Sequence, residues 1–261
     1  MVKKIFKIAY RDLRGGYKEF NVFLFCLILG VLSIVLIGTV RDSINNGLAA
    51  SSSEILGGDA SIELVYRFAS EEENKVFSDN SDRMSETIKF RSMVRPISSA
   101  EFNQNVLVQA KAVDLKYPLY GKIELDPPIE LDEALKKNNG IPGIIVGPAL
   151  LDRLQIKVGE KLILGDELFE LRAQILKEPD AGSNTFSLGP RVMVYTSALI
   201  DSQLLGSGTM FRSNYALRVA PETNLELLES KITNFFPDSG FRWKDRNNPT
   251  PGLKSFVNRI A

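Results

Sequence analysis

The stretch EFNVFLFCLILGVLSIVLIGTVR, Glu19 to Arg41, contains no Asp, Glu, Lys or Arg between its two charged ends. A helix rises 1.5 Å per residue, so residues 20–40 extend over roughly 30 Å, the thickness of the hydrocarbon core of a bilayer. The stretch therefore predicts a transmembrane helix, and the rest of the chain is interpreted relative to it.

Two other interpretations of this stretch are less well supported. A buried helix of a soluble protein would carry more polar positions than Asn21, Ser33 and Thr39. A cleavable signal has an apolar region of about 7 to 15 residues, which is shorter than this one, although the tract GLAASSS at residues 47–53 imitates a cleavage site. A membrane span remains the preferred interpretation.

The residues before the span are basic and amphipathic. The apolar residues Ile5, Phe6, Ala9 and Leu13 share one side of a helix, and Gly15-Gly16 follows as a break. The bases of this leader are Lys3, Lys4, Lys7, Arg11, Arg14 and Lys18. By the positive-inside rule the N-terminus is cytoplasmic and the chain after the span is periplasmic. The leader is either an amphipathic helix at the anionic membrane surface or a basic flank without defined structure.

The overall composition excludes several kinds of function. The chain of 261 residues has 32 basic and 32 acidic residues, one cysteine and no histidine. Without histidine it cannot build a Ser-His-Asp triad, a Cys-His pair or an HExxH zinc site. Residues 1–19 hold six bases against two acids, whereas residues 20–261 hold 26 bases against 30 acids. The body is therefore mildly acidic, which argues against nucleic acid as its partner. We expect no enzyme activity, no metal, no cofactor and no nucleic-acid partner.

The chain after the span alternates between strand and helix patterns. The helix is expected to continue to about Leu56, where Gly57-Gly58 stops it. The strand DASIELVYRF follows, and Ser70 with Glu73 has the spacing of a capping box. Two further strands, SETIKFRSMVRPIS and FNQNVLVQAKAVD, are joined by a turn at residues 98–100.

A strand-rich segment then interrupts this pattern. It contains a short strand, a helix after Pro148, and a hairpin at Gly165-Asp166 whose apolar positions are expected at Leu162, Leu164, Leu168 and Ile175. The strand PRVMVYTSAL follows. The first pattern returns with the strand SNYALRVA, a helix with Pro221 near its start, and the strand GFRWKDR. The fold is predicted to be α+β, with the strand-rich segment inserted between two halves of one domain.

Four stretches together resemble the FtsX-like permeases of ABC systems. They are IAYRDLRGGYKEFNVFLFCLILGV, ILGGDASIEL, VGPALLDRLQIKVGEKLILGDELFEL followed by EPD, and NNPTPGLKSFVNRI. They occur in this order over nearly the whole chain, and they resemble in particular the YbbP type, which is related to the MacB and LolC/LolE transmembrane subunits. The resemblance implies a MacB-like periplasmic domain with an α+β porter part split by a small β-rich sabre part.

The resemblance implies a division of the chain into segments. We expect a cytoplasmic amphipathic elbow at 1–18, the transmembrane helix at 19–41, a stalk helix at 42–57, the first half of the porter at 58–120, the sabre at 121–206, the second half of the porter at 207–248, and the start of a helix returning to the membrane at 249–261. The last pattern stops without a cap, so we expect the chain to be the N-terminal fragment of a longer permease.

Three candidate sites emerge, each with a simpler alternative. Arg11, Asp12 and Arg14 form a coupling elbow for an ATPase, or only charge at the membrane surface. Gly57 and Gly58, with Asp59 after them, form a hinge, or only a helix stop followed by the start of a strand. The loop EPDAGSNTFSLGPR forms a periplasmic contact element through Asp180, Phe186 and Leu188, or only a flexible connection.

The function implied by the resemblance is that of an inner-membrane permease subunit. Its partner would be a cytoplasmic ABC ATPase, since the P-loop pattern GxxxxGK[ST] is absent here. ATP hydrolysis by that partner would move the periplasmic domain, a process called mechanotransmission, and so act on a lipid, lipoprotein or other envelope substrate, with membrane lipids and a periplasmic protein as further partners. The alternative is a single-pass anchored ligand-binding or sensor module.

Overall fold

The protein is described from a computed structural model, which covers residues 17–97, 105–184, 189–200, 202, 204–205 and 208–247, without the side chains at 17–20, 41–51, 182–184 and 200. The chain divides into two compact units, residues 1–50 and residues 51–261. The predicted leader helix, the turn at 98–100 and the return helix at 249–261 lie outside the described residues.

The first described element is a single long helix, α2 (Tyr17–Leu56). Its segment Asn21–Val40 is long and apolar enough to cross a membrane, and none of that segment is buried against the rest of the structure. The prediction of a helix of membrane-spanning length and apolarity is confirmed.

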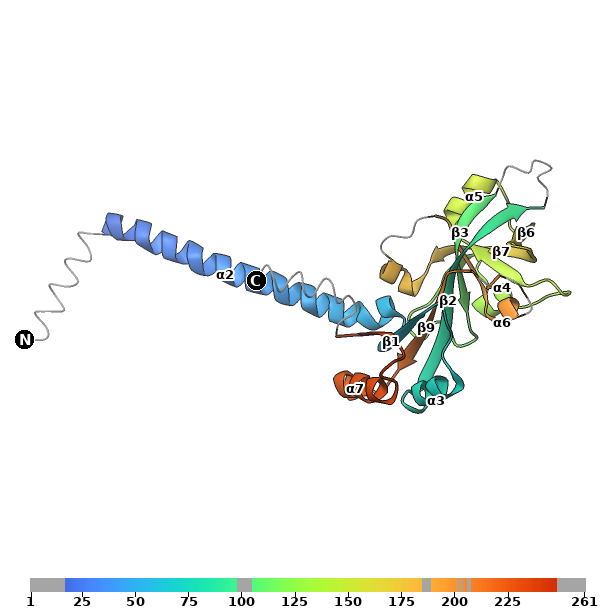
Figure 1. Ribbon diagram of the computed structural model, residues 1–261. Helices are drawn as coiled ribbons and strands as arrows, with labels where there is room; N and C mark the ends of the chain where they lie inside the picture. The colour runs from blue at the N-terminus through green and yellow to red at the C-terminus, as the bar shows by residue number, and fades with distance from the viewer. Residues whose placement is uncertain are drawn as a thin grey trace, which may run out of the picture. The chain divides into compact units, whose positions relative to one another are not determined.

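The second unit is built on one ten-stranded mixed sheet (Figure 1). Its strands are β1 (Ala60–Val65), β2 (Arg83–Pro96), β3 (Val106–Val113), β4 (Glu124–Asp126), β5 (Gly143–Val146), β6 (Lys161–Leu164), β7 (Glu167–Lys177), β8 (Arg191–Tyr195), β9 (Phe211–Arg218) and β10 (Arg242–Asp245). Its helices are α3 (Glu71–Asp79), α4 (Leu131–Leu135), α5 (Pro148–Leu154), the 3-10 helix η1 (Pro179–Asn184), α6 (Ser197–Ile200) and α7 (Leu225–Phe235). The predicted α+β class is confirmed.

The strand order is β10-β1-β9-β2-β3-β8-β5-β7-β4, and β6 pairs with both β2 and β7. Strands β2, β3, β8, β5, β7 and β6 therefore close into a small barrel. Strand β2 makes this closure possible because its first half pairs with β9 and its last residues pair with β6. It is shared by the open part of the sheet and by the barrel.

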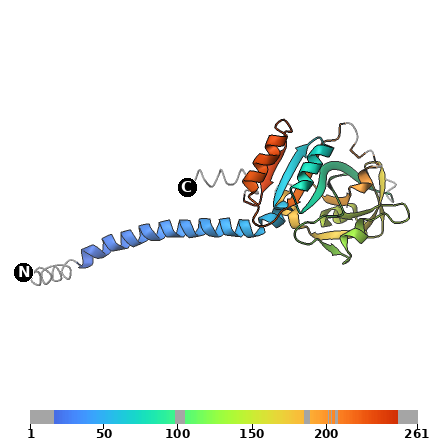
Figure 2. The ribbon, with the colours of Figure 1, turned by 90° about the horizontal axis from the view of Figure 1, so that it is seen from below.

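Three hydrophobic clusters hold these parts together. The barrel interior contains Phe90, Val108, Leu162, Phe169 and Val194 among others. A second cluster lies between the open part of the sheet and the helices α3 and α7, which run alongside β1 and β9 (Figure 2). A third covers part of the outer barrel surface with α4 and β4. Burial of this apolar area is the main stabilising term, at roughly 25 cal/mol per Å².

Local sequence signals are confirmed at two places. Ser70 accepts from the amide of Glu73, and the Glu73 side chain accepts from the Ser70 amide, which completes the predicted capping box. Gly165-Asp166 connects β6 to β7, with Leu164 opposite Glu167, as expected for a two-residue hairpin.

Two predictions about local structure are wrong. Leu168 is on the outer side of β7, and Phe169 is the residue that fills the barrel, because the two-residue turn pairs Phe169 with Leu162. Pro221 is not at the start of α7, because Asn224 caps that helix by accepting from the amides of Glu226 and Leu227. The predicted porter and sabre boundaries stay a prediction, and strands from all three predicted segments pair in one sheet.

Candidate functional site

Helix α2 ends at two glycines with different roles. Gly57 has φ +78°, a conformation that side chains disfavour and that commonly terminates a helix. Gly58 is in tight contact with the sheet, since a Cβ there would be 2.9 Å from the Ala60 carbonyl oxygen and 3.0 Å from that of Leu217. Only residues 57–59 separate the end of α2 from the start of β1.

Asp59, the next residue, binds four groups from different parts of the second unit. Its carboxylate accepts hydrogen bonds from Ser53 Oγ at 2.9 Å, Tyr120 Oη at 2.7 Å, the Val219 amide at 3.0 Å and Arg246 Nη1 at 3.1 Å. The residue is only 2% exposed. A buried carboxylate is stable only when its oxygens are paired in this way.

The surroundings of Asp59 determine its charge state. Burial pushes the pKa of its carboxyl upward, but the hydrogen bonds from Tyr120, Val219, Ser53 and Arg246 outweigh burial and hold the pKa below its ordinary value. Burial and the bond to Asp59 raise the pKa of Tyr120 to about 12. The pair is therefore a neutral phenol donating to an anion at neutral pH.

We name this arrangement the helix-end joint. It consists of Ser53, Gly57, Gly58, Asp59, Tyr120, Val219 and Arg246. It ties the last turn of α2 to the loop before β4 and to the residues that follow β9 and β10.

A second polar cluster adjoins the joint. Lys111 Nζ, from the middle of β3, lies 2.7 Å from Asp180, 2.9 Å from Glu178 and 2.9 Å from the Tyr117 hydroxyl. A Cβ at Gly57 would be 3.5 Å from the side chain of Asp180, which places this Lys111 cluster beside the end of α2.

The Lys111 cluster is buried and internally neutralised. Burial pushes the pKa of Asp180 upward. The charges of Lys111 and Lys89, with the hydrogen bonds from Lys111 and Tyr117, outweigh burial and hold this pKa below its ordinary value. Burial and the nearby Asp180 raise the pKa of Tyr117. Glu178 also pairs with Arg191 at 3.1 Å, so the cluster fixes the base of the loop between β7 and β8 to the strands β3 and β8.

The structure brings together three of the predicted site residues, Gly57, Gly58 and Asp180. Asp180 is buried with an internal partner, while Phe186 and Leu188 lie outside the described residues, as do Arg11, Asp12 and Arg14. Sequence reasoning placed Asp59 in the hinge but missed the partners of its carboxylate, and it missed Lys111 altogether. A lysine within the apolar strand VLVQAKAV is the signal that points to Lys111, because a buried lysine requires an acidic partner.

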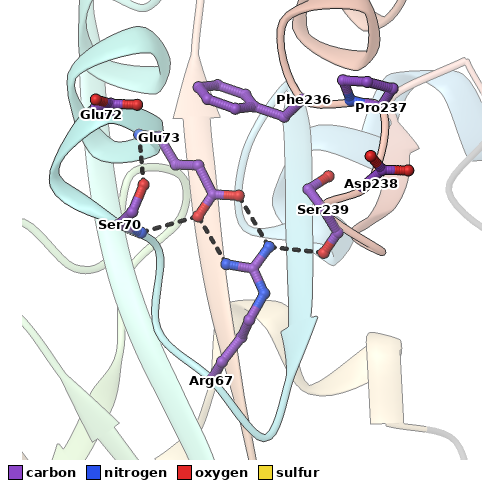
Figure 3. A pocket seen from close by; sticks show the side chains of 8 residues that line it. All are labelled: Arg67, Ser70, Glu72, Glu73, Phe236, Pro237, Asp238 and Ser239. Carbon is purple, nitrogen blue, oxygen red and sulfur yellow. Dashed lines mark hydrogen bonds and ion pairs between the residues drawn. The ribbon is translucent and has the colours of Figure 1, made fainter.

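A surface pocket of about 390 Å³ lies between the start of α3 and the end of α7 (Figure 3). It is lined by Arg67, Ser70, Glu72, Glu73, Phe236, Pro237, Asp238 and Ser239.

Two charged groups of this pocket, Arg67 and Glu73, are paired with each other. Arg67 donates to both carboxylate oxygens of Glu73, at 2.7 and 2.8 Å, and to the Ser239 carbonyl at 2.7 Å. These bonds hold the pKa of Glu73 below its ordinary value. Arg67 thus joins the start of α3 to the segment after α7 (Figure 3). Within the described residues, no group of three or more His, Cys, Asp or Glu side chains is arranged to hold a metal ion.

These features define an α+β domain that follows a helix of membrane-spanning length and apolarity. Among curated proteins the chain is similar to the uncharacterized ABC transporter permease YbbP of Escherichia coli (strain K12), with 26% identity over 172 residues. This match covers 64% of the chain, and the chain spans about a fifth of the relative, 19% of its length. The resemblance to the FtsX-like ABC transporter permeases is thereby confirmed, and an inner-membrane location fits both the helix and the match. No family model matches the chain.

Three solved structures match the chain, each with a TM-score below 0.5. The periplasmic region of MacB from Actinobacillus actinomycetemcomitans has a TM-score of 0.49 and 7% identity, over 77% of this chain and 94% of that one. The extracellular domain of the ABC-type transporter YknZ from Gram-positive bacteria has a TM-score of 0.46 and 9% identity, over 71% and 100%. A domain of a putative permease from Porphyromonas gingivalis has a TM-score of 0.47 and 10% identity, over 78% and 97%.

Proposed function

We propose that the chain belongs to the permease subunit of an ABC-type export or mechanotransmission system. In this proposal a cytoplasmic ATPase hydrolyses ATP, and the permease converts that cycle into movement of its periplasmic domain. The substrate is a lipid, a lipoprotein or another envelope compound. The sequence match to an ABC transporter permease supports the class of protein.

The observation that carries the coupling step is the continuity of α2 with the joint. The helix is unbroken from Tyr17 to Leu56, and three residues later Asp59 is bound by groups from the loop before β4, the segment after β9 and the segment after β10. A displacement of the last turn of α2 must therefore move these groups or break several hydrogen bonds to a buried charge. Each hydrogen bond to a charged group contributes about 1.5–3 kcal/mol to stability, so breaking several of them is costly.

Three segments have a role in this coupling: the N-terminal elbow, the hinge after α2 and the loop after β7. The N-terminus is cytoplasmic, and Arg11, Asp12 and Arg14 form the elbow that follows the ATPase. Gly57 and Gly58 form the hinge region beside the joint. In the loop after β7, Asp180 holds the base to Lys111 and leaves Phe186 and Leu188 as the residues that contact a substrate or a partner protein.

The experiment is co-purification of the full-length protein in mild detergent, followed by assay of ATP hydrolysis. We expect an ABC ATPase to accompany the protein, and we expect R11A/R14A to change its rate of hydrolysis. R83A/R153A serves as the matched control, since it removes two exposed arginines from the second unit. Recovery of the intact protein without any ATPase would contradict the proposal.

The alternative is a membrane-anchored ligand-binding or sensor module, and the pocket beside α3 and α7 favours it. Sequence beyond residue 261 in the full-length protein separates the two functions. Further apolar runs of about 20 residues support the permease, whereas a kinase or methyl-accepting region supports the sensor.

A further inference from the structure

One side of the open sheet is rich in exposed arginines. In the strand register Arg242 of β10 lies opposite Glu63 of β1, and Arg212 of β9 lies opposite Lys89 of β2. Side chains alternate along a strand, so Arg91 is on the same side as Lys89. This side is opposite to the one that α3 and α7 cover, because Ile62 and Leu64, which flank Glu63, are buried beneath those helices.

Apolar side chains continue this surface onto the barrel. Met93 follows Arg91 on the same side of β2 and pairs with Leu107 of β3, and both are exposed, by 43% and 49%. We call the set Arg91, Arg212, Arg242, Met93 and Leu107 the arginine face.

The guanidinium groups of this face have N–H donors that can bind a ligand. Arg212 and Arg242 have side chains that are 58% and 65% exposed, and they share one carboxylate oxygen of Glu63 at 3.9 and 3.6 Å. Neither contact is a hydrogen bond, and this buried oxygen has no hydrogen-bond partner in the described part of the chain. Arg91 is exposed and makes no ion pair with the described residues.

The face therefore carries an excess of positive charge. Of the nearby acids, Glu63 is nearly buried, and Glu178 and Asp180 are already neutralised by Lys111 and Arg191. A guanidinium binds carboxylates through two parallel N–H donors, and it is more weakly hydrated than an ammonium group.

The shape and composition of the face favour a protein over a small molecule. Small-molecule sites are concave, whereas this surface is the side of a sheet, and the pocket described above is built from other residues. Arginine and methionine are enriched in protein interfaces, where aliphatic groups pack beside charged rims. We propose that the arginine face binds an acidic segment of a partner protein, with its carboxylates on Arg91, Arg212 and Arg242 and its aliphatic side chains on Met93 and Leu107.

This interaction goes beyond the coupling function and stands without it, because binding at the face requires neither an ATPase nor movement of α2. Removing the three arginines leaves the helix-end joint and the hydrophobic clusters untouched. If an ATPase co-purifies with the protein but the arginine face does not bind an acidic peptide, only the present inference is contradicted.

The experiment titrates the full chain, in a zwitterionic detergent, with a fluorescent synthetic peptide of alternating glutamate and leucine. Exposed ion pairs are individually weak and R91A/R212A/R242A removes three of them, so we expect this variant to weaken binding about tenfold or more. Added salt should weaken it further, since exposed charges are screened. K122A/K137A/K177A is the matched control, because it removes three exposed cations elsewhere, and we expect less than about a twofold change. Thermal melting checks that both variants fold.

Other outcomes overturn the inference. Absence of peptide binding, or equal losses in the two triple variants, would show that the face has no particular affinity for acidic protein. Binding of dihexanoyl phosphatidylglycerol that depends on the arginines, without peptide binding, would assign the face to an anionic lipid. Arginine-dependent self-association without peptide binding would assign it to a second copy of the chain.

Discussion

The phenolic hydroxyl of Tyr120 donates a hydrogen bond of 2.7 Å to Asp59 Oδ2. The same carboxylate oxygen accepts from the amide of Val219 at 3.0 Å. One buried atom thus connects the residue after the helix stop to two segments far away in the sequence. This arrangement explains why the end of α2 is part of the second unit.

Substitution of Asp59 by alanine is expected to destabilise the second unit by about 3 kcal/mol, because it leaves buried donors without an acceptor. For a domain of this size the loss corresponds to a decrease in Tm of about 6–12 °C. Thermal unfolding of the full chain measures the change. Asp152→Ala, at an exposed position on α5, is the control and should shift the Tm by less than about 2 °C.

The Lys111 cluster is expected to behave as one unit. Lys111→Met removes the ammonium group that lies 2.7 Å from the buried carboxylate of Asp180, at a cost of about 3 kcal/mol. The double variant K111M/D180N removes both charges and should cost less than the sum of the two single variants. A double-mutant cycle by denaturant unfolding measures this coupling, and strict additivity would show that the two residues act independently.

Acidification is expected to destabilise the second unit through Asp59. Its pKa is lowered in the folded state from an ordinary value of 3.8, so the unfolded chain takes up protons first as the pH falls. The stabilisation is present above about pH 4 and is lost as the pH falls through the folded pKa. Asp59→Asn should flatten this part of the stability curve, as measured by unfolding at a series of pH values. An unchanged acid profile in the variant would rule out Asp59 as a contributor.

The two glycines at the helix stop are expected to differ in their response to alanine. Gly57→Ala meets only ordinary contacts but must adopt φ +78°, which costs about 1–2 kcal/mol. Gly58→Ala places its Cβ within 3.0 Å of two backbone oxygens, which cannot move independently of the sheet. We expect the larger loss, about 3 kcal/mol, at Gly58, and thermal unfolding of the two variants tests the order. Equal losses would mean that the backbone adapts.

Local features of this fold could be predicted from the sequence because nearby residues determine them. The capping box at Ser70 and the turn at Gly165 are of this kind. Leu168 was assigned to the wrong side of β7 because alternation alone does not fix the phase of a strand, whereas the pairing of Leu164 with Glu167 does.

Long-range features could not be predicted in the same way. Closure of the barrel depends on the pairing of Val94 with Leu164, and no local pattern encodes that contact. The partners of Asp59 are likewise distant, with Arg246 separated from it by nearly the whole domain. Gly57 and Gly58 could be recognised from the sequence because glycine has a local conformational role. The role of Asp59 depends on partners that only the folded structure brings to it.

The central claim is that movement passes along α2 into the helix-end joint. It is tested by hydrogen exchange in the complex of the full-length protein with its ATPase, with and without trapped ATP. The informative amides are those of Asp59, which donates to the Leu217 carbonyl, and Val219, which donates to Asp59. A flexible Gly-Ser insertion between Ala50 and Ser51 interrupts the helix, and a helical insertion of about two turns is its control. We predict that ATP changes the exchange of both amides in the intact protein and in the helical control but not in the flexible variant. Exchange that is independent of ATP in the intact complex would contradict the claim.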